Sequence, residues 1–480
     1  MINYDVIIGI EVHVNINSKA KMFSYAPNSH NQKPNTQVDL LDIAILGILP
    51  TVNMEVINKS IILADSLNME IFYNNIAFDR KHYIYYDLPK GYQITQQYHP
   101  IGRNGSIILS NNKKITIERI HIEEDTAKQI TKNNIKYLDY NRSGMPLIEI
   151  VSDPCINSAS EASEYLNELK KILVFKDISD AKLEDGSMRA DINISLKKKD
   201  TDILGTKVEI KNINSFNNII KAIGYEISRQ SEILDNNELI IQETRRYDDN
   251  KSTTVSMRNK TDVIGYSYCP EPNIPIISLE EKYVLDLINN SKKSVQLIEQ
   301  ELKDLNFSKS NIDLLMNDFN LYSLFIRFND SKIVDKINLF NFVTNEISGN
   351  LNKAKIDWKS LSENQINDLI ELIKLLQSNK INIKEAKSFN KLIITDNEEL
   401  KNLIQKNKTN NVFTKEDIEK ILINYFNDNN KLVLEYKERP ERVSKFFIGM
   451  VMKETKAQAD PKIVLEIFNE KIKNFFEQKS

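Results

Sequence analysis

Residues 7–17 read "IIGIEVHVNIN", a short apolar segment with regularly placed polar side chains. Its two sets of alternating residues are Ile10, Val12, Val14 and Ile16, and Glu11, His13 and Asn15. Because successive side chains of a strand point to opposite faces, the segment predicts a β-strand with one apolar and one polar face. The apolar face packs on a core, and the polar face is either solvated or the floor of a polar site.

Four later segments repeat this design: "ERIHIEEDTAK" (118–128), "SMRADINISL" (187–196), "TKVEIKN" (206–212) and "IQETRRYDD" (241–249). Their alternating polar positions carry His121, Glu123 and Asp125; Arg189, Asp191, Asn193 and Ser195; Lys207, Glu209 and Lys211; and Glu243 and Arg245. Any one of these faces, taken singly, is best read as the wet side of an antiparallel sheet.

Taken together, the polar faces favour a functional site, because short acids recur beside Lys, Arg and His and few threonines are present. Carboxylate oxygens are hard ligands that suit Mg²⁺, and Lys and Arg bind phosphate oxygens. A face that supplies both is what phosphoryl transfer from Mg·ATP requires.

Length and composition place the chain among globular proteins, with 480 residues, 41% hydrophobic and 27% charged. A prior of about 150 residues per domain predicts roughly three domains. No apolar run reaches the about 20 residues that span a bilayer, and the N-terminus lacks a signal-peptide layout, so we expect a cytoplasmic protein without membrane contact. The net charge of −3 argues against a general nucleic-acid coat but leaves room for a local basic patch. Cys155 and Cys269 are isolated, which argues against disulfides and cysteine zinc sites.

The chain changes character near residue 290. Before it, the predicted strands are 5–17, 115–124, 146–152, 190–196, 206–211 and 253–258, and the predicted helices are 55–68, 159–175 and 216–235. This order predicts an α+β domain with a mostly antiparallel sheet over residues 1–290, and "IGRNGS" (101–106) is read as a hairpin loop. Helical domains are predicted over 291–408 and 409–480.

Two helical patterns in the second half are "SKSNIDLLMNDFNLYSLFIRF" (308–328) and "LSENQINDLIELIKLLQSNKI" (361–381). Ser362 and Gln365 form a predicted capping box, and Thr414 is a predicted cap of the last helical domain.

Simple catalytic signatures are absent from the sequence, which has no GxxxxGK[ST] loop, no GxGxxG after a strand and no GxSxG elbow. A resident hydrolytic nucleophile is therefore unsupported. The stretch "DRKHYIYYDLPKGYQITQQ" (79–97) mixes tyrosines with basic residues. It either stacks bases and neutralises phosphate, or is a tyrosine-rich loop packed on the sheet.

Long segments of residues 7–275 resemble the B subunits of the aspartyl/glutamyl-tRNA(Asn/Gln) amidotransferases (the GatB family). In that family's order they read "IGIEVHVNINSKAKMFS", "FDRKHYIYYDLPKGYQITQ", "IHIEEDTAK", "DYNRSGMPLIEIVSDP", "LEDGSMRADINISL", "TKVEIKNINSFNNIIKAIGYEISRQ" and "QETRRYDD". The helical remainder resembles the family in layout.

The resemblance implies a catalytic "cradle" similar to the glutamine synthetase fold, followed by a helical domain and a tail domain that contacts tRNA. It implies a heterotrimer with an amidase, the A subunit, which frees ammonia from glutamine, and with a small C subunit. The B subunit would use ATP and Mg²⁺ to phosphorylate the side-chain carboxylate of Glu on tRNA(Gln) or Asp on tRNA(Asn). Channelled ammonia would then displace the phosphate, because phosphorylation gives the carboxylate a leaving group.

Carried onto this sequence, the resemblance implies a metal site at Glu11, His13 and Glu124, with Glu123, Asp191 and Glu209 as further candidates. Strict alternation puts Glu124 opposite Glu123, so both face the site only if the strand ends or bulges there. The chemistry of Lys and Arg adds Arg189 and Lys207 as catalytic candidates. It also gives the candidates for nucleotide contact, which are Lys81, Lys90, Lys211 and Arg245. The candidates for tRNA contact combine tyrosines that can stack on bases with basic residues of the tail: Tyr83, Tyr85, Lys437, Arg439, Lys453 and Lys456.

The chain also departs from the family. Some members carry paired cysteines near residues 21–36 that form a zinc site, and none stand there here, so we expect no zinc. The glycine expected near Lys456 is missing, although the segment 437–461 stays basic. The alternatives are a stand-alone glutamine synthetase-like ligase, disfavoured by the helical tail, and a non-catalytic tRNA-binding scaffold.

Overall fold

The structure is a computed structural model that describes residues 4–29, 32–199, 201, 203–259, 265–329, 333, 335–410, 415–455, 459 and 461–477. The chain separates into two compact units, Met1–Phe319 and Asn320–Ser480. No helix within the described residues is both long and apolar enough to cross a membrane.

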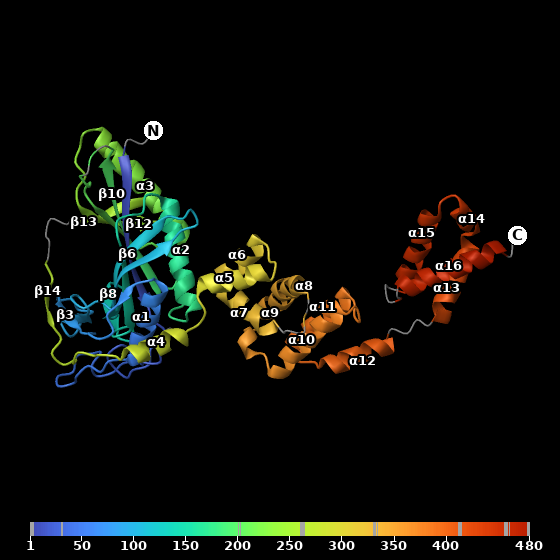
Figure 1. Ribbon diagram of the computed structural model, residues 1–480, viewed down its shortest axis with the longest axis horizontal. Coiled ribbons are helices and arrows are strands. Elements are labelled where there is room, and N and C mark those ends of the chain that lie inside the picture. The colour runs from blue at the N-terminus through green and yellow to red at the C-terminus, as the bar shows by residue number, and fades with distance from the viewer. Residues whose placement is uncertain are drawn as a thin grey trace. The chain divides into compact units, whose positions relative to one another are not determined.

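The first unit is built on a large sheet with helices beside it (Figure 1). Within the described chain this main sheet has nine strands, in the order β13-β12-β11-β10-β1-β9-β6-β5-β2. Their bounds are β1 Tyr4–Asn15, β2 Glu70–Ile71, β5 Gly102–Ile108, β6 Lys114–Glu124, β9 Pro146–Ser152, β10 Met188–Lys198, β11 Val208–Lys211, β12 Glu243–Asp248 and β13 Thr253–Asn259. All neighbouring pairs are antiparallel except β11 and β12, which run parallel. The predicted α+β class with a mostly antiparallel sheet and a helical C-terminal region is therefore confirmed.

Three helices, α1 Met54–Ser66, α2 Ala159–Phe175 and α3 Phe216–Asp235, pack against the main sheet or against one another. The apolar side of β1 is fully buried, with Ile8, Ile10, Val12 and Val14 at 0% exposure. Ser158 and Ser215 cap α2 and α3 by accepting hydrogen bonds from Glu161 N and Asn218 N. The alternation seen in the sequence thus buries one face of β1 and leaves its polar face for other contacts.

A smaller three-stranded sheet joins β14 Ser267–Pro270, β3 Asp79–His82 and β4 Tyr92–Thr95 in that order. Its strand β4 lies beside the end of β6, because Ile122 N donates to Gln96 Oε1 at 2.9 Å and Ile94 N donates to a side-chain oxygen of Glu124 at 3.0 Å. The hairpin of β7 Lys128–Lys132 and β8 Ile135–Asp139 forms a third sheet.

The predicted hairpin loop at 101–106 is wrong, because these residues begin strand β5. Two glycines explain the missed strand. A Cβ atom at Gly105 would lie 2.6 Å from Met69 Cγ, and one at Gly102 would lie 3.2 Å from Ala64 Cβ. Glycine is needed at these two positions because the backbone of β5 packs closely against α1 and the segment that follows it. The glycines therefore do not mark a turn.

The first unit ends with α4 Glu281–Asn289, α5 Val295–Asp304 and α6 Lys309–Asn317. The predicted helical segment 308–328 is split at Asp318, whose backbone is extended (φ −128°, ψ 95°). The domain boundaries predicted at 290 and 408 stay predictions, and the residues just after 290 group with the first unit.

The second unit is helical throughout its described elements. They are α7 Phe319–Phe328, α8 Lys336–Asn341, a π-helical turn Phe342–Ile347, α9 Ser348–Ala354, a 3₁₀ turn Trp358–Ser360, α10 Glu363–Gln377, α11 Ile383–Thr395, α12 Leu400–Asn410, α13 Lys415–Asp428, α14 Asn430–Leu434, a 3₁₀ turn Glu435–Lys437, α15 Pro440–Glu454 and α16 Pro461–Glu477. The predicted capping box of Ser362 and Gln365 is confirmed at the start of α10. Thr414 lies outside the described residues. Helices α13, α15 and α16 share a hydrophobic core that includes Leu422, Phe447 and Phe468.

Candidate functional site

Strand pairing places four charged or ionisable residues in one row across the polar face of the main sheet. Arg189 on β10 pairs with His13 on β1, His13 pairs with Glu149 on β9, and Glu149 pairs with His121 on β6. Directly paired residues of antiparallel strands have side chains on the same face, about 5 Å apart. From β10 to β6, the row therefore contains a guanidinium, an imidazole, a carboxylate and a second imidazole.

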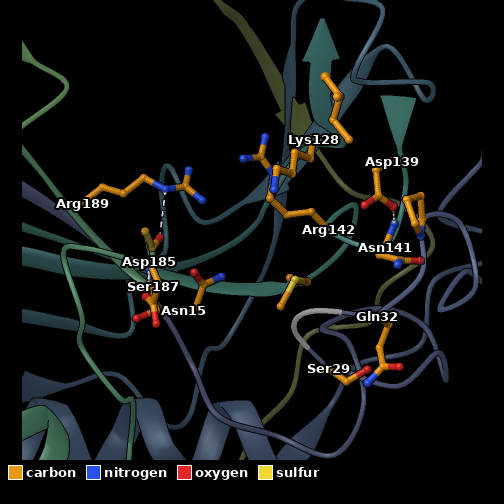
Figure 2. Close-up of a pocket in the computed structure, with 14 residues that line it drawn as sticks. Asn15, Ser29, Gln32, Lys128, Asp139, Asn141, Arg142, Asp185, Ser187 and Arg189 are labelled. Atoms are coloured by element: carbon orange, nitrogen blue, oxygen red, sulfur yellow. Dashed lines mark hydrogen bonds between the residues drawn. The ribbon is translucent and has the colours of Figure 1, made fainter. Parts of the chain in front are cut away.

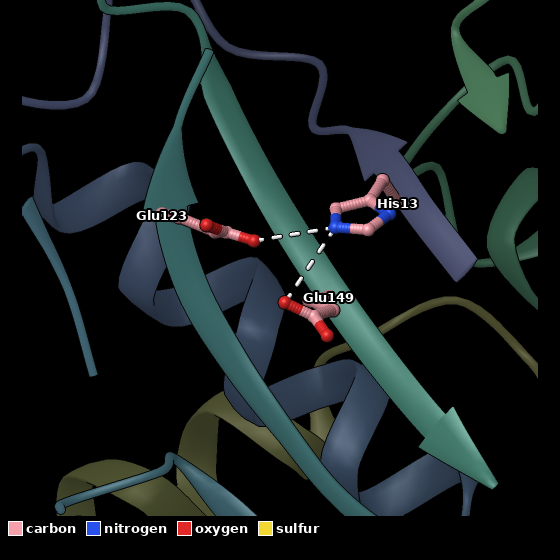
Figure 3. Close-up of side chains that lie close together, drawn as sticks. All are labelled: His13, Glu123 and Glu149. Atoms are coloured by element: carbon pink, nitrogen blue, oxygen red, sulfur yellow. Dashed lines mark ion pairs between the residues drawn. The ribbon is translucent and has the colours of Figure 1, made fainter. Parts of the chain in front are cut away.

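Glu123, two residues beyond His121 on β6, approaches the His13 and Glu149 side chains of this row (Figure 3). His13 Nε2 lies 3.5 Å from Glu123 Oε1 and 3.5 Å from Glu149 Oε2. His121 Nε2 lies 3.0 Å from Glu149 Oε2. One ligand atom from each of His13, Glu123 and Glu149 lies within 4.8 Å of the others, a spacing compatible with a shared metal ion.

The three groups shift one another's pKa values strongly. Burial alone would lower the pKa of His13, but the hydrogen bond to Glu149 and the charge of Glu123 outweigh it and raise the pKa to about 9. Burial, and next the charge of Glu149, raise the pKa of Glu123 to about 7. Burial also opposes ionisation of Glu149, but hydrogen bonds from His121 and His13 outweigh it and hold its pKa below the usual range.

The cluster fits a divalent cation on two grounds. Its donors are one imidazole and two carboxylates, a set that binds Mg²⁺ or Mn²⁺ through its oxygens. Glu123 Oε1 is buried and has no hydrogen-bond partner among the described residues, whereas its other oxygen accepts from Gln93 Nε2 at 2.7 Å. An unbonded buried carboxylate oxygen is costly unless a cation or water satisfies it.

Three other predicted metal ligands lie further along the same face and form a separate group around Lys211. Glu11 pairs with Asp191 across β1 and β10, and accepts from Asn193 Nδ2 at 2.9 Å. Lys211 Nζ forms ion pairs with Asp191 and, at 3.3 Å, with Glu209. These contacts bring Lys211 into the polar face, as its sequence position suggests.

Glu124 does not join His13. Its Oε1 accepts from Lys90 Nζ and, at 3.0 Å, from Ile94 N on the small sheet. The register of β6 shifts between Ile117 and Arg119, and alternation holds from there to the last residue of the strand. Glu123 therefore faces the cluster, and Glu124 contacts Lys90 and Ile94. The predicted Lys90 side chain is thereby bound to the predicted Glu124 carboxylate.

Lys81 and Tyr83 lie on or next to the small sheet beside the cluster. Tyr83 OH donates to Gln93 Oε1 at 3.3 Å, and the same glutamine donates to Glu123. Lys81 Nζ lies 4.7 Å from the ring centre of Tyr266, and its charge acts on Glu123. Tyr85 is more exposed and packs edge-on against Tyr83, with ring centres 6.1 Å apart.

Arg189 borders a pocket of about 440 Å³ that begins next to the cluster (Figure 2). Asn15, two residues beyond His13 on β1, lines the same pocket, as do Arg142 and Lys128. Figure 2 shows these cationic side chains reaching the pocket from separate parts of the chain, above Ser187. The pocket offers three cationic side chains with amide and hydroxyl groups, and the carboxylates of Asp139 and Asp185 also line it. This mixture suits a strongly polar ligand that carries negative charge.

Two predicted residues lie elsewhere. Arg245 belongs to an ion-pair group behind the sheet, where its Nε lies 3.1 Å from Glu226 Oε1 on α3 and it also pairs with Glu243. Lys207 is exposed in the segment before β11.

The tail candidates Lys437, Arg439 and Lys453 are exposed in or beside the 3₁₀ turn and α15. Lys456 lies outside the described residues.

Sequence reasoning missed Glu149, His121, Gln93 and Arg142 as members of the site. Glu149 has a signal, since it is a lone acid in the apolar run "PLIEIVS" (146–152). His121 stands on the predicted polar face but was not assigned a role. Gln93 and Arg142 sit on segments whose position follows from tertiary packing, and no sequence pattern places them.

Comparisons with known proteins match both parts of the chain. A family model described as the GatB/GatE catalytic domain matches residues 6–285, and one described as the GatB domain matches residues 328–472. Proteins named as the B subunit of aspartyl/glutamyl-tRNA(Asn/Gln) amidotransferase are similar over nearly full length. The one from Malacoplasma penetrans is 46% identical, covering 98% of both chains. Those from Ureaplasma urealyticum and Mycoplasma genitalium are 45% and 42% identical, each covering 97% of this chain and 98% and 97% of their own.

Proposed function

Because the chain belongs to the GatB family of tRNA amidotransferase B subunits, we propose that it carries the ATP-dependent step of tRNA transamidation. In this step it phosphorylates the side-chain carboxylate of Glu on tRNA(Gln) or Asp on tRNA(Asn), and ammonia then displaces the phosphate. The observation that carries the proposal is the juxtaposition of the His13, Glu123 and Glu149 cluster with a cationic pocket on one polar sheet face.

His13, Glu123 and Glu149 would hold Mg²⁺, which neutralises phosphate charge and orients the transferring group when bound. His121 and Gln93 orient the carboxylates of Glu149 and Glu123 through hydrogen bonds at 3.0 and 2.7 Å. Such supporting contacts fix ligand geometry before the substrate arrives.

Arg189 would stabilise the negative charge that develops on the phosphoryl oxygens. Its pairing with His13 across β1 and β10 supports this role, because Arg189 also lines the pocket. Lys81 supplies a second positive charge from the small sheet, near enough to act on Glu123. Fixed cations of this kind stabilise a transition state more than a ground state. Lys90 and Lys211 are already paired with carboxylates, so their nucleotide contact requires those pairs to open.

The tRNA would approach at two places. Tyr83 and Tyr85, with exposed Ile84 between them, form an aromatic edge on which the terminal base of the acceptor end can stack. The exposed basic residues Lys437, Arg439 and Lys453 would contact tRNA phosphates through the tail.

The relatives are named as B subunits, which supports assembly of this chain into a multi-subunit amidotransferase. We propose two partners in the cytoplasm, an amidase A subunit that supplies ammonia from glutamine and a small C subunit. The catalytic unit is proposed to share the glutamine synthetase-like cradle, which the large sheet with one polar face supports.

The experiment combines the purified trimer with ATP, glutamine and each mischarged tRNA, with and without a chelator. The proposal expects amide formation on at least one tRNA, dependent on ATP and abolished by the chelator. Amide formation on free glutamate without tRNA would identify a stand-alone ligase instead. Undiminished activity of a trimer in which this chain carries His13→Ala would identify a scaffold.

A further inference from the structure

Asp125, the residue directly after β6, holds two arginines of the pocket at once. Its side chain is buried, at 5% exposure. Arg189 Nη2 donates to Asp125 Oδ2 at 2.5 Å, and Arg142 Nε lies 3.6 Å from the same oxygen. The two arginines come from different parts of the chain, and a single carboxylate forms ion pairs with both.

Asp125 is itself fixed by the backbone. Its N–H donates to Met145 O at 2.9 Å, and its carbonyl accepts from Gly144 N at 2.9 Å. Arg142 is fixed further by donating to Thr126 O at 2.8 Å and to Ala127 O at 2.9 Å. The anchor and both guanidiniums therefore have little freedom relative to β6, the strand that carries Glu123.

Both guanidiniums line the pocket beside the metal cluster, where Arg189 is the cross-strand partner of His13. Hydrogen bonds between ionised groups are about twice as strong as neutral ones, and the planar guanidinium fork is directional. Asp125 accepts from one N–H group of Arg189, and Arg142 uses its Nε and Nη2 for the carbonyls of Thr126 and Ala127. Other N–H groups of both forks are therefore directed elsewhere. A phosphoryl oxygen bound in the pocket would accept hydrogen bonds from these remaining N–H groups.

We infer that Asp125 is a positioning residue, which holds Arg189 and Arg142 so that both contact the transferring phosphoryl group. The inference rests on the proposed function and adds Arg142 to the groups that bind this substrate. Asp125 itself would touch no substrate and would act through the two arginines.

The test measures steady-state ATP-dependent transamidation by the trimer with Asp125→Asn, Arg189→Lys and the double variant. Asp125→Asn keeps the size of the side chain and removes its charge. We expect kcat to fall about 100-fold, because a displacement near 1 Å costs this much, while KM for ATP changes less. We also expect Asp125→Glu, which restores the carboxylate, to recover part of kcat.

The double variant separates positioning from a structural role. If Asp125 acts through the two arginines, the loss of kcat in the double variant is smaller than the product of the two single losses, because the contact of Arg189 can be lost only once. Multiplying losses, or a kcat unchanged by Asp125→Asn, would overturn the inference. The matched control is Asp177→Asn, which removes an exposed carboxylate that pairs with Lys292 at 3.3 Å, and it should leave kcat unchanged.

Two further outcomes stay distinguishable. A wild-type trimer that forms amide without ATP contradicts the proposed function, whereas an ATP-dependent wild type with a fully active Asp125→Asn contradicts the inference alone. If the Asp125→Asn variant does not fold, the same kinetic measurement is made with Arg142→Lys, which leaves Asp125 in place. The inference then requires at least a tenfold loss of kcat, and an unchanged kcat would overturn it.

Discussion

Glu149 is the residue on which the candidate metal site depends. Its carboxylate lies 3.0 Å from His121 Nε2 and 3.5 Å from His13 Nε2, and these contacts lower its pKa. The Glu149 carboxylate stays ionised and offsets the positive charge of His13, whose pKa is about 9. A divalent cation that displaces the protons of His13 and of Glu123, whose pKa is about 7, would then meet two negative carboxylates.

Glu149→Gln should therefore weaken metal binding without changing the size of the side chain. We expect the Mg²⁺ concentration for half-maximal ATP-dependent transamidation to rise about 10- to 100-fold, the usual cost of disturbing a metal site's ligand set. A Mg²⁺ titration of the trimer's activity measures it. Glu118→Gln on the same β6 strand, where the side chain is 48% exposed and pairs with Arg119, is the control. An unchanged titration for Glu149→Gln would remove Glu149 from the site.

At the scale of elements, alternation predicts which face each side chain takes, but strand order decides which faces meet. The strands of His13 and Glu123 were predicted within three residues of their observed bounds, and β9 at its observed bounds. That β9 lies between them follows from its pairing with β1 over more than a hundred residues of chain, in addition to its nearer pairing with β6. The local patterns consequently did not predict Glu149 as a site residue. They grouped Glu124 with His13, although its side chain accepts a hydrogen bond from Ile94 N on β4. Non-local pairing is the information that one sequence with local patterns does not contain.

Helix α3 is fastened to β12 and β13 by a buried carboxylate, and this attachment should depend on pH. Burial raises the pKa of Glu226, but hydrogen bonds from Arg229 and Thr254 outweigh it and the net shift is downward. Because the folded-state pKa is depressed, the group stabilises the fold above its unfolded value of 4.5 and loses this effect as pH falls through the folded value.

We expect Glu226→Gln to lower the free energy of unfolding of the first unit by about 3 kcal/mol at pH 7, because it leaves the half-buried Arg229 and Arg245 with Glu243 as their one remaining carboxylate partner among the described residues. The difference from wild type should shrink below pH 4.5. Urea unfolding followed by circular dichroism at both pH values measures it. Fluorescence of Trp358, the single tryptophan and a residue of the second unit, should be unaffected. A pH-independent difference would contradict the assignment.

At the scale of the whole molecule, the chain joins a catalytic unit to a helical unit of a different kind. The first is built on a sheet with one polar face, and the second contains helices whose apolar sides share a core. Helix α15 buries Val443, Phe447 and Val451 and turns its basic residues outward. Exposed basic side chains on a helix suit contact with tRNA phosphates, which strengthens binding without recognising the base sequence of the tRNA.

Replacing Lys437, Arg442 and Lys445 by Ala should weaken tRNA binding by the trimer and flatten its salt dependence. Each lost phosphate contact should reduce the slope of log affinity against log salt by about 1. Filter binding across a range of salt concentrations measures both. The charge-matched control replaces Lys380, Lys384 and Lys391, which are exposed in or near α11. Equal effects of the two sets would mean that the tail makes no special contact.

The polar face of β1 is proposed to carry the ATP-dependent chemistry through His13. The most direct measurement compares glutamine hydrolysis and ATP-dependent transamidation by trimers that contain wild-type chain or His13→Ala. We expect His13→Ala to lower transamidation at least about 100-fold, in the range of a lost catalytic metal or acid–base group, while glutamine hydrolysis by the partner amidase persists. Transamidation at the wild-type rate by His13→Ala would contradict the proposal.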